Sequence, residues 1–231
     1  MNFTNDTVMI TVYISLFIQI VTTVYSFKSL NYKVSEENEI LKDILKLELV
    51  VQLIEATFYI WVVYSLKNFK NITKNRYNDW LITTPTMLIS SIIFFKYQEY
   101  KEKNSQENIV FLDFLKENSK IITKIVIFNG LMLLFGYLGE TNKLNKELSI
   151  CIGFVFFFLS FKTIYDEYAQ KSVLGKKLFT LLSIVWGLYG VAAFYDRNTK
   201  NIMYNSLDVV AKNFFGLYIS YKIKNLSPQT L

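Results

Sequence analysis

Four polar residues near the end of the chain recur at helical spacing within an apolar segment. Asn201, Asn205, Asp208 and Lys212 fall on one face of a helix in NIMYNSLDVVAKNFFGLYIS. Lys212 lies ten residues before Lys222, too deep for its ammonium group to reach water easily. A structural ion pair is one interpretation of Asp208 and Lys212. A buried lysine is also suited to Schiff-base formation with an aldehyde, which makes this face a candidate functional site.

A second charged residue lies in a similarly apolar segment, RYNDWLITTPTMLIS. Asp79 is costly to hold there as a carboxylate, so a charged partner is expected. A protonated Schiff base on Lys212 would need counterions, and Asp79 and Asp208 are deep carboxylates on different segments. Two unit charges about 4 Å apart interact by about 4 kcal/mol at an effective dielectric constant of about 20. The sequence therefore predicts that both aspartates face Lys212.

The composition places these residues in a membrane protein. Of the 231 residues, 52% are hydrophobic and 17% are aromatic, and the mean hydropathy is +0.26. The chain has no histidine and one cysteine, Cys151, which argues against a zinc site, a histidine-activated nucleophile and an internal disulfide. We therefore expect neither a metal site nor an enzyme. The net charge of +6 is spread over short polar gaps, which indicates membrane topology rather than nucleic-acid binding.

Seven apolar segments are long enough to cross a bilayer core about 30 Å thick. No alternating pattern typical of membrane β-strands recurs. The prediction is an all-α membrane protein, a seven-transmembrane-helix bundle that forms one domain over residues 1–231. The expected helices span residues 6–27, 40–66, 75–98, 119–140, 148–168, 176–196 and 199–222.

The basic residues predict how this bundle is oriented. If the N terminus lies outside, the inner gaps and the C-terminal tail hold about twice as many of the 25 lysine and arginine residues as the outer gaps. We therefore expect the N terminus outside and the C terminus in the cytoplasm. The longest polar gap, residues 96–118, contains IVFLDFL, which forms either a short amphipathic helix on the membrane surface or part of a disordered loop.

The segments RYNDWLITTP and LDVVAK resemble the helix-three and helix-seven motifs of the microbial (type 1) rhodopsins, and the similarity extends across all seven helices. The resemblance implies that the chain binds all-trans retinal covalently, as a Schiff base on Lys212. Asp79, Thr83 and Ser90 match the three diagnostic positions of the family as D-T-S. It also implies that Asp79 is the main counterion and proton acceptor, with Thr83 hydrogen-bonded to it. Asp208 is then the secondary counterion.

Two further expectations concern the residues around Lys212, Asp79 and Asp208. Arg76 is expected to steady both aspartates. The resemblance also supplies a retinal pocket, through NGLMLLFG on the fourth helix and WGLYG on the sixth. Each pocket residue taken alone is also explained by core packing, but together they describe an apolar, aromatic slot that ends at charged groups. The implied pocket residues are Tyr59, Trp80, Thr84, Asn129, Met132, Gly136, Trp186 and Tyr189.

Two of the pocket positions carry more specific expectations. Thr84 and Asn129 are expected to share a hydrogen bond between helices. Gly190 stands where pumps of the family commonly have a proline, so the sixth helix is expected to bend differently.

Polar residues also recur on one face of the first, second and seventh predicted helices. On the second helix, Glu48, Gln52 and Glu55 follow one another at helical spacing. If these faces point inward, they enclose a hydrated path for ions, with carboxylates of the kind that cation pathways use. Glu48 is equally explained as a solvated residue near the inner surface. The predicted path residues are Ser15, Gln19, Glu48, Gln52, Glu55, Asn201 and Asn205.

The predicted path has an expected closure in the dark. Ser15, Glu48 and Asn205 are expected to close its inner part, and Glu55 with Asp208 its centre. By resemblance, the glutamates of the second helix are similar to those of channelrhodopsins, with Glu55 near the central gate. D-T-S together with these glutamates most resembles the group-1 viral rhodopsins, known as light-gated cation channels.

The resulting prediction is a retinal-binding photoreceptor that acts as a light-gated cation channel. A light-driven outward proton pump is the first alternative. It is less favoured because Ser90 stands at the donor position and Lys200 stands where outward pumps commonly place a proton-release glutamate. A sensory rhodopsin is the second alternative, but it needs a transducer, and none is identifiable.

The expected partners are the lipid bilayer and permeating cations, with no nucleic acid. A homo-oligomer is left open. The expected location is that of a multi-pass integral membrane protein of the cell membrane, with the membrane of an infected host as one alternative.

Overall fold

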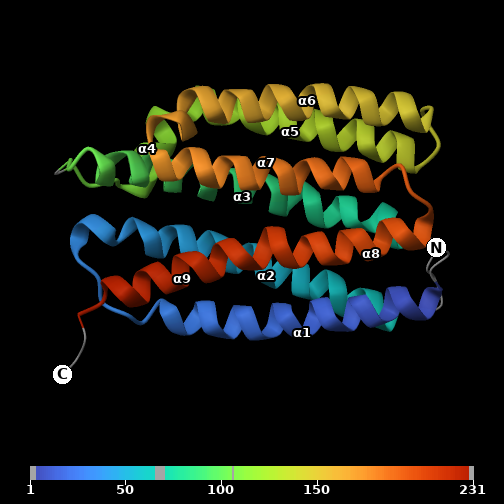
Figure 1. Cartoon of the computed structure of the whole chain (residues 1–231), viewed down its shortest axis with the longest axis horizontal. Helices are drawn as coiled ribbons and strands as arrows, with labels where there is room; N and C mark the ends of the chain where they lie inside the picture. Colours follow the sequence, from blue (N-terminus) through green and yellow to red (C-terminus); the bar gives the residue numbers. More distant parts are fainter. Residues whose placement is uncertain (1–3, 66–70, 106, 229–231) are drawn as a thin grey trace.

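The computed structural model describes residues 4–65, 71–105 and 107–228, and it is helical nearly throughout these ranges (Figure 1). The long helices alternate in direction along the chain (Figure 1). We call the end of the bundle near the N terminus the N-side and the opposite end the C-side (Figure 1). The elements are α1 (Asn5–Ser29), η1 (Glu36–Asn38), α2 (Ile40–Tyr64), α3 (Ile72–Glu102), α4 (Phe111–Glu117), α5 (Ser119–Glu140), α6 (Lys146–Glu167), η3 (Ala169–Lys171), α7 (Val173–Ala192), α8 (Arg197–Asp208), η4 (Val209–Asn213) and α9 (Phe214–Leu226).

The bundle has seven transmembrane helices, as predicted. In the described part of the chain, six helices are long and apolar enough to cross a membrane: α1, α2 with η1, α3, α5, α6 with η3, and α7. The seventh is the continuous helix α8–η4–α9, residues 197–226, which is too polar to be recognised by hydropathy. The predicted bounds agree with the observed ones to within a few residues. Residue 66, the predicted end of the second helix, lies outside the described residues.

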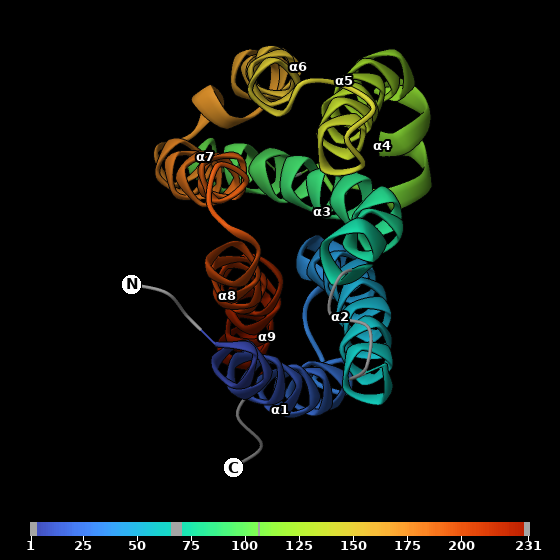
Figure 2. The ribbon, with the colours of Figure 1, turned by 90° about the vertical axis from the view of Figure 1, so that its right-hand side faces the viewer.

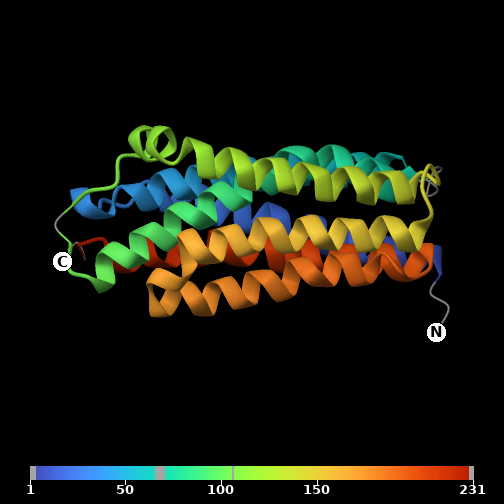
Figure 3. The same ribbon diagram turned by 90° about the horizontal axis from the view of Figure 1, so that it is seen from above.

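An end-on view shows how the helices surround the interior (Figure 2). α8 and α9 lie between α1 and α7, and α3 crosses the middle of the bundle between α2 and the group α5, α6 and α7. α1, α2 and α9 are mutual neighbours, so the three helices predicted to share a polar interior do lie side by side. The short helix predicted within residues 96–118 is α4, which lies at the C-side next to α5 (Figure 3).

The start of the seventh helix is fixed by its N-cap residue. The Asp196 carboxylate accepts hydrogen bonds from the backbone N–H groups of Asn198 and Thr199 and from the Thr199 hydroxyl. These bonds satisfy N–H groups that lack partners in the first helical turn. They also stabilise the ionised form, so the pKa of Asp196 lies below its usual range, mainly because of the Thr199 hydroxyl.

Candidate functional site

Lys212 lies in the π-helical stretch η4 and is almost completely buried, with 2% of its surface exposed. Its ammonium nitrogen Nζ is 2.6 Å from Asp79 Oδ2, 3.5 Å from Glu55 Oε1 and 3.7 Å from Asp208 Oδ1. Three carboxylates from α2, α3 and α8 therefore surround one lysine. π-helical turns inside α-helices occur frequently at functional sites, because the extra residue changes the direction of nearby side chains.

A second buried cation neutralises Asp208. The guanidinium group of Arg76, which is fully buried on α3, donates to Asp208 Oδ2 at 2.5 Å and also to Asn205. The hydroxyls of Tyr59 and Tyr189 each donate to the Asp208 carboxylate at 2.8 Å. Asp208 is thus held by three donors as well as lying near Lys212, as charged groups in low dielectric require.

The expectation that Arg76 steadies both aspartates holds for only one of them. Among the described residues, no hydrogen bond joins Arg76 to Asp79, whose carboxylate instead accepts from Lys212. Arg76 precedes Asp79 by three residues on α3, but its long side chain extends toward α8, where Asp208 and the Asn205 amide offer acceptors. The two aspartates therefore have different partners: Asp79 pairs with Lys212, and Asp208 pairs mainly with Arg76.

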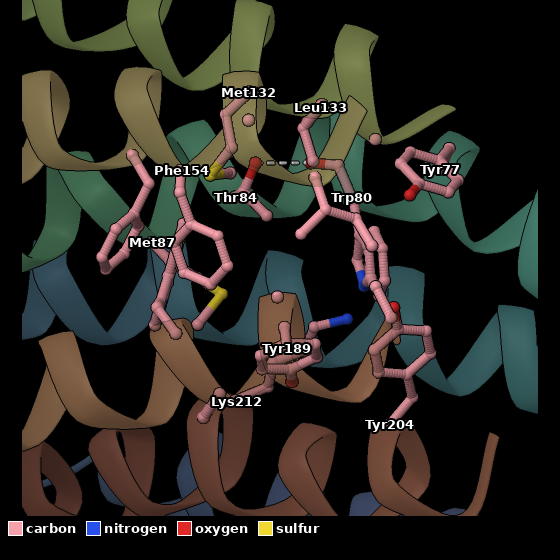
Figure 4. A pocket seen from close by; sticks show the side chains of 18 residues that line it. Tyr77, Trp80, Thr84, Met87, Met132, Leu133, Phe154, Tyr189, Tyr204 and Lys212 are labelled. Carbon is pink, nitrogen blue, oxygen red and sulfur yellow. Dashed lines mark hydrogen bonds between the residues drawn. The ribbon is translucent and has the colours of Figure 1, made fainter. Parts of the chain in front are cut away.

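An apolar cavity of about 110 Å³ begins at Lys212 and extends between α3, α5, α6 and α7. Trp80 on α3 and Tyr189 on α7 meet edge to face, with ring centroids 5.6 Å apart. Figure 4 shows Met87 and Phe154 at one end of the cavity and Tyr77 and Tyr204 toward the other. The cavity is thus a long slot with aromatic walls and a single amine at its side, an arrangement suited to an elongated apolar ligand that carries an aldehyde.

The comparisons with known proteins agree with this geometry. The family model described as "Bacteriorhodopsin-like protein" matches residues 5–226. The chain belongs to the bacteriorhodopsin-like family. No curated protein matches the sequence.

Solved structures of the same fold resemble the chain over nearly its whole length. Viral rhodopsin OLPVRII is 25% identical, with a TM-score of 0.79 over 96% of this chain and 99% of that one. Xanthorhodopsin, described as a light-driven ion pump with dual chromophore, is 17% identical, with a TM-score of 0.71 over 95% and 93%. Bromide-bound halorhodopsin from Halobacterium salinarum is 11% identical, with a TM-score of 0.72 over 97% and 98%.

Membership in the bacteriorhodopsin-like family gives the slot a ligand class, because proteins of this family bind a retinal chromophore and are integral to the membrane. The residues of this chain fit that ligand. The slot is apolar, and one buried amine reaches it. The indole nitrogen of Trp186 is buried and has no hydrogen-bond partner among the described residues.

Most of the pocket residues expected for a bacteriorhodopsin-like protein line the slot. Tyr59 does not: its hydroxyl binds Asp208, so it belongs to the charged group rather than to the slot wall. Asn129 also lies outside the wall, but it donates to Thr84 Oγ1 at 2.7 Å, which confirms the expected interhelical hydrogen bond. The expected residues that line the slot are Trp80, Thr84, Met132, Gly136, Trp186 and Tyr189.

Thr83 does not make the contact predicted for it. Its hydroxyl donates to the main-chain oxygen of Asp79 at 3.0 Å, not to the carboxylate. The hydroxyl of a threonine in a helix reaches the carbonyl four residues earlier more easily than a side chain on the same helix. Thr83 therefore stabilises the backbone of α3 next to Asp79 and leaves the carboxylate to Lys212.

Several site residues were not predicted from the sequence. Tyr204 lies four residues before Asp208 and eight before Lys212, so helical spacing could have found it; its ring stacks on that of Tyr189 at 5.6 Å. Glu140 at the N-side end of α5 accepts from Lys200 at 2.5 Å. No local pattern predicts this ion pair, because its members are on helices that are distant in the sequence.

A row of polar contacts joins α1 to the seventh helix and to α2. Thr11 accepts from the Asn205 amide at 2.7 Å, and the Ser15 hydroxyl donates to the Asn205 main-chain oxygen at 3.0 Å. Further toward the C-side, Gln19 donates to Glu55 and Thr22 donates to Asn213. The predicted polar faces of these helices therefore meet in the interior.

The expected grouping of Ser15, Glu48 and Asn205 is wrong. Ser15 and Asn205 are in contact, but Glu48 lies further toward the C-side, where it accepts from the Ser90 hydroxyl. α1 and α8 start at the N-side, whereas Glu48 follows the C-side start of α2 by two turns. Glu48 is also fully buried, so it is not a solvated surface residue. Asn201, another predicted path residue, donates a hydrogen bond to Thr73 at the N-side.

Replacing Gly190 by alanine should narrow the slot. The added Cβ would lie 2.4 Å from Phe154 Cζ, so the Phe154 ring would have to move, at a cost of about 1–3 kcal/mol. We expect a shifted visible absorption band and slower pigment formation after retinal is added to the purified protein. Gly187→Ala is the matched control, because its Cβ would meet nothing within 4 Å. Equal spectra and rates for the two variants would show that Phe154 does not shape the ligand site.

Proposed function

We propose that this protein binds all-trans retinal through Lys212 and acts as a light-gated cation channel, with its N-side outside the cell. The observation that carries the proposal is the position of Glu55. This residue accepts a hydrogen bond from Gln19 within the polar row of α1 and α2, and its carboxylate lies 3.5 Å from Lys212. One side chain thus belongs both to the charged group of the ligand site and to the polar interior between α1, α2 and α9.

Lys212 would hold the ligand, and Asp79 at 2.6 Å would balance the positive charge of its nitrogen. Retinal, when bound, supplies light absorption and an isomerisation that changes position and charge at its point of attachment. Trp80, Tyr189 and Trp186 would confine the ligand within the apolar slot and keep water away from it.

The contacts around Glu55 explain how a change at Lys212 would reach an ion path. In the dark, Glu55 accepts from Gln19 and faces Lys212, so the interior is closed by direct contacts between side chains. Displacement of Lys212 removes the nearest positive charge from Glu55, whose other carboxylate oxygen is held by the Gln19 amide. Because the exposed carboxylates are negative, they lower the electrostatic barrier for cations and raise it for anions.

Photocurrents recorded against membrane voltage test this proposal. A channel passes current down the electrochemical gradient, so the current should reverse sign with voltage and vanish at zero voltage in symmetric solutions. A pump drives current in one direction under those conditions. A sustained outward proton current at zero voltage would contradict the channel proposal.

Glu55→Gln should change cation selectivity or reduce conductance while the protein still forms pigment. The substitution keeps the shape of the side chain and its contact with Gln19 but removes a negative charge near Lys212. We expect a several-fold loss of photocurrent per pigment molecule, because one charge on the path is worth about 1 kcal/mol or more. Thr57→Val, on an exposed position of the same helix, is the control. Unchanged photocurrents in Glu55→Gln would show that Glu55 does not line the ion path.

One contact favours the proton pump as a second candidate. The α3 position expected to carry a proton donor holds Ser90, but Ser90 donates a hydrogen bond to the buried carboxyl group of Glu48 on α2. A carboxyl group is therefore present at that depth, supplied by a neighbouring helix. If Glu48→Gln slows the return to the dark state and the current is unidirectional at zero voltage, the pump is the correct function.

A further inference from the structure

The interior between α1, α2 and α9 contains side-chain atoms that make no hydrogen bond in the described structure. Gln52 has both its amide nitrogen and its amide oxygen unpaired, although the residue is fully buried. One oxygen each of Glu48 and Glu55 is also without a hydrogen bond. A buried polar atom without a partner costs about 1–3 kcal/mol, so a site with several such atoms normally holds water or an ion.

These atoms belong to one helical face. Gln52 follows Glu48 by four residues and precedes Glu55 by three, so all three side chains project from the same side of α2. That side faces the seventh helix at Gly216, one turn beyond Lys212: a Cβ at Gly216 would lie 2.5 Å from Gln52 Nε2 and 3.6 Å from Glu48 Cβ. The backbone of α9 can approach Gln52 this closely only because residue 216 has no side chain.

The charges of this region favour a cation there. The buried carboxylates near Lys212 are Glu55, Asp79 and Asp208, and the buried cations are Lys212 and Arg76. The group therefore has one more acid than base, and the buried carboxyl group of Glu48 adds another. Excess negative charge in a low-dielectric interior is stabilised by binding a positive ion or a proton.

We propose that Gln52, together with the free oxygen of Glu48 and the Glu55 oxygen that faces Lys212 at 3.5 Å, binds a partly dehydrated monovalent cation, and that Gly216 sets the width of this site. This proposal rests on the proposed channel function, and it assigns to Gln52 the selection of the cation that passes. An amide oxygen is a neutral ligand that replaces a water molecule around the ion, while the two carboxyl groups supply the attraction. Because the site is one turn from Lys212, displacement of the seventh helix changes its width directly.

Gly216→Ala is the most direct test, since it moves Gln52 without removing it. The new Cβ would displace the end of a flexible side chain rather than backbone, so the protein should fold and form pigment. We expect the ratio of Na⁺ to K⁺ permeability, measured from reversal potentials, to change by about threefold or more, as loss of one polar contact gives. Gly130→Ala, which meets nothing within 4 Å, should leave the ratio unchanged, and Gln52→Leu should reproduce the effect.

A second measurement separates failure of the site from failure of the channel. A cation bound beside Glu55 alters the field at Lys212, so Na⁺, compared with N-methylglucamine, should shift the visible band of the wild type but not of Gly216→Ala. If the wild type conducts and Gly216→Ala leaves the permeability ratio unchanged, the cation site is wrong and the channel stands. If the wild type does not conduct, the channel proposal is wrong, and the absorption spectra alone decide on the cation site. A visible band that shifts with Na⁺ in the wild type but not in Gly216→Ala supports the site. A wild-type band that does not change with Na⁺ overturns it.

Discussion

Lys212→Ala should yield a protein that forms no visible pigment when all-trans retinal is added. Lys212 is the only amine among the residues that line the slot, and it is 2% exposed, so no other described lysine can replace it there. The expected effect is complete loss of the absorption band, measured on purified protein reconstituted in detergent or lipid. A band of wild-type intensity in this variant would contradict the assignment of the slot as the retinal site.

A second variant distinguishes loss of the attachment point from loss of the fold. Removing the ammonium group leaves Asp79 without its closest partner, which alone destabilises a buried carboxylate. Lys212→Arg keeps a positive charge but cannot form the covalent link. Circular dichroism should show a helical protein, and the visible band should still be missing. Mass spectrometry after borohydride reduction should place the retinal adduct of the wild type on the peptide that contains Lys212.

Asp79→Asn and Asp208→Asn should have different effects on the absorption spectrum and on stability, because the two aspartates have different partners. Asp79 is the carboxylate closest to Lys212, at 2.6 Å, and it stabilises positive charge on that nitrogen. Removing its charge should shift the visible band to longer wavelength. Asp208, 3.7 Å from Lys212, is held mainly by Arg76 and two tyrosines, so its loss should shift the band less.

The loss of folding stability should be larger for Asp208→Asn than for Asp79→Asn, the opposite of the order of the spectral shifts. Asp208→Asn leaves the fully buried Arg76 guanidinium without its carboxylate, and breaking a buried ion pair costs about 3–5 kcal/mol. Asp79→Asn leaves Lys212 with Glu55 and Asp208 nearby, so a smaller loss is expected. Thermal unfolding of the pigments measures this difference, with Asp113→Asn on the exposed helix α4 as a charge-matched control. A larger red shift for Asp208→Asn than for Asp79→Asn would refute this division of roles.

The sequence predicted the helices well because six of them contain an apolar run long enough to cross a bilayer, and the more polar seventh helix is marked by the helical spacing of Asp208 and Lys212. It also predicted that Asp79 and Lys212 meet, since two charges in apolar segments must find partners. It could not show that Arg76 binds Asp208 rather than Asp79, because both acids are within reach of a long side chain. Which one it contacts depends on how α3 and α8 are rotated against each other.

Polarity alone does not give the depth of a residue in the bundle. Polarity alone groups Glu48 with Ser15, although α2 starts at the C-side and α1 starts at the N-side. Adding the distance of each residue from the start of its helix would have separated them, at 1.5 Å per residue. The partnership of Glu48 with Ser90 depends on the side-by-side packing of α2 and α3, which no local pattern encodes.

The polarity of the seventh helix has a consequence for how the protein is made. In the described part of the chain, six helices are long and apolar enough to cross a bilayer, but α8–η4–α9 carries buried Lys200, Asp208 and Lys212. A lysine or aspartate at the centre of an isolated helix costs about 2.5–3.5 kcal/mol to insert. Asp79 and Arg76 on α3 offset this cost only when α3 is already in the membrane. We therefore expect insertion of the last helix to depend on prior insertion of α3, because the ion pairs at the chromophore site are also the contacts that compensate the charges of that helix.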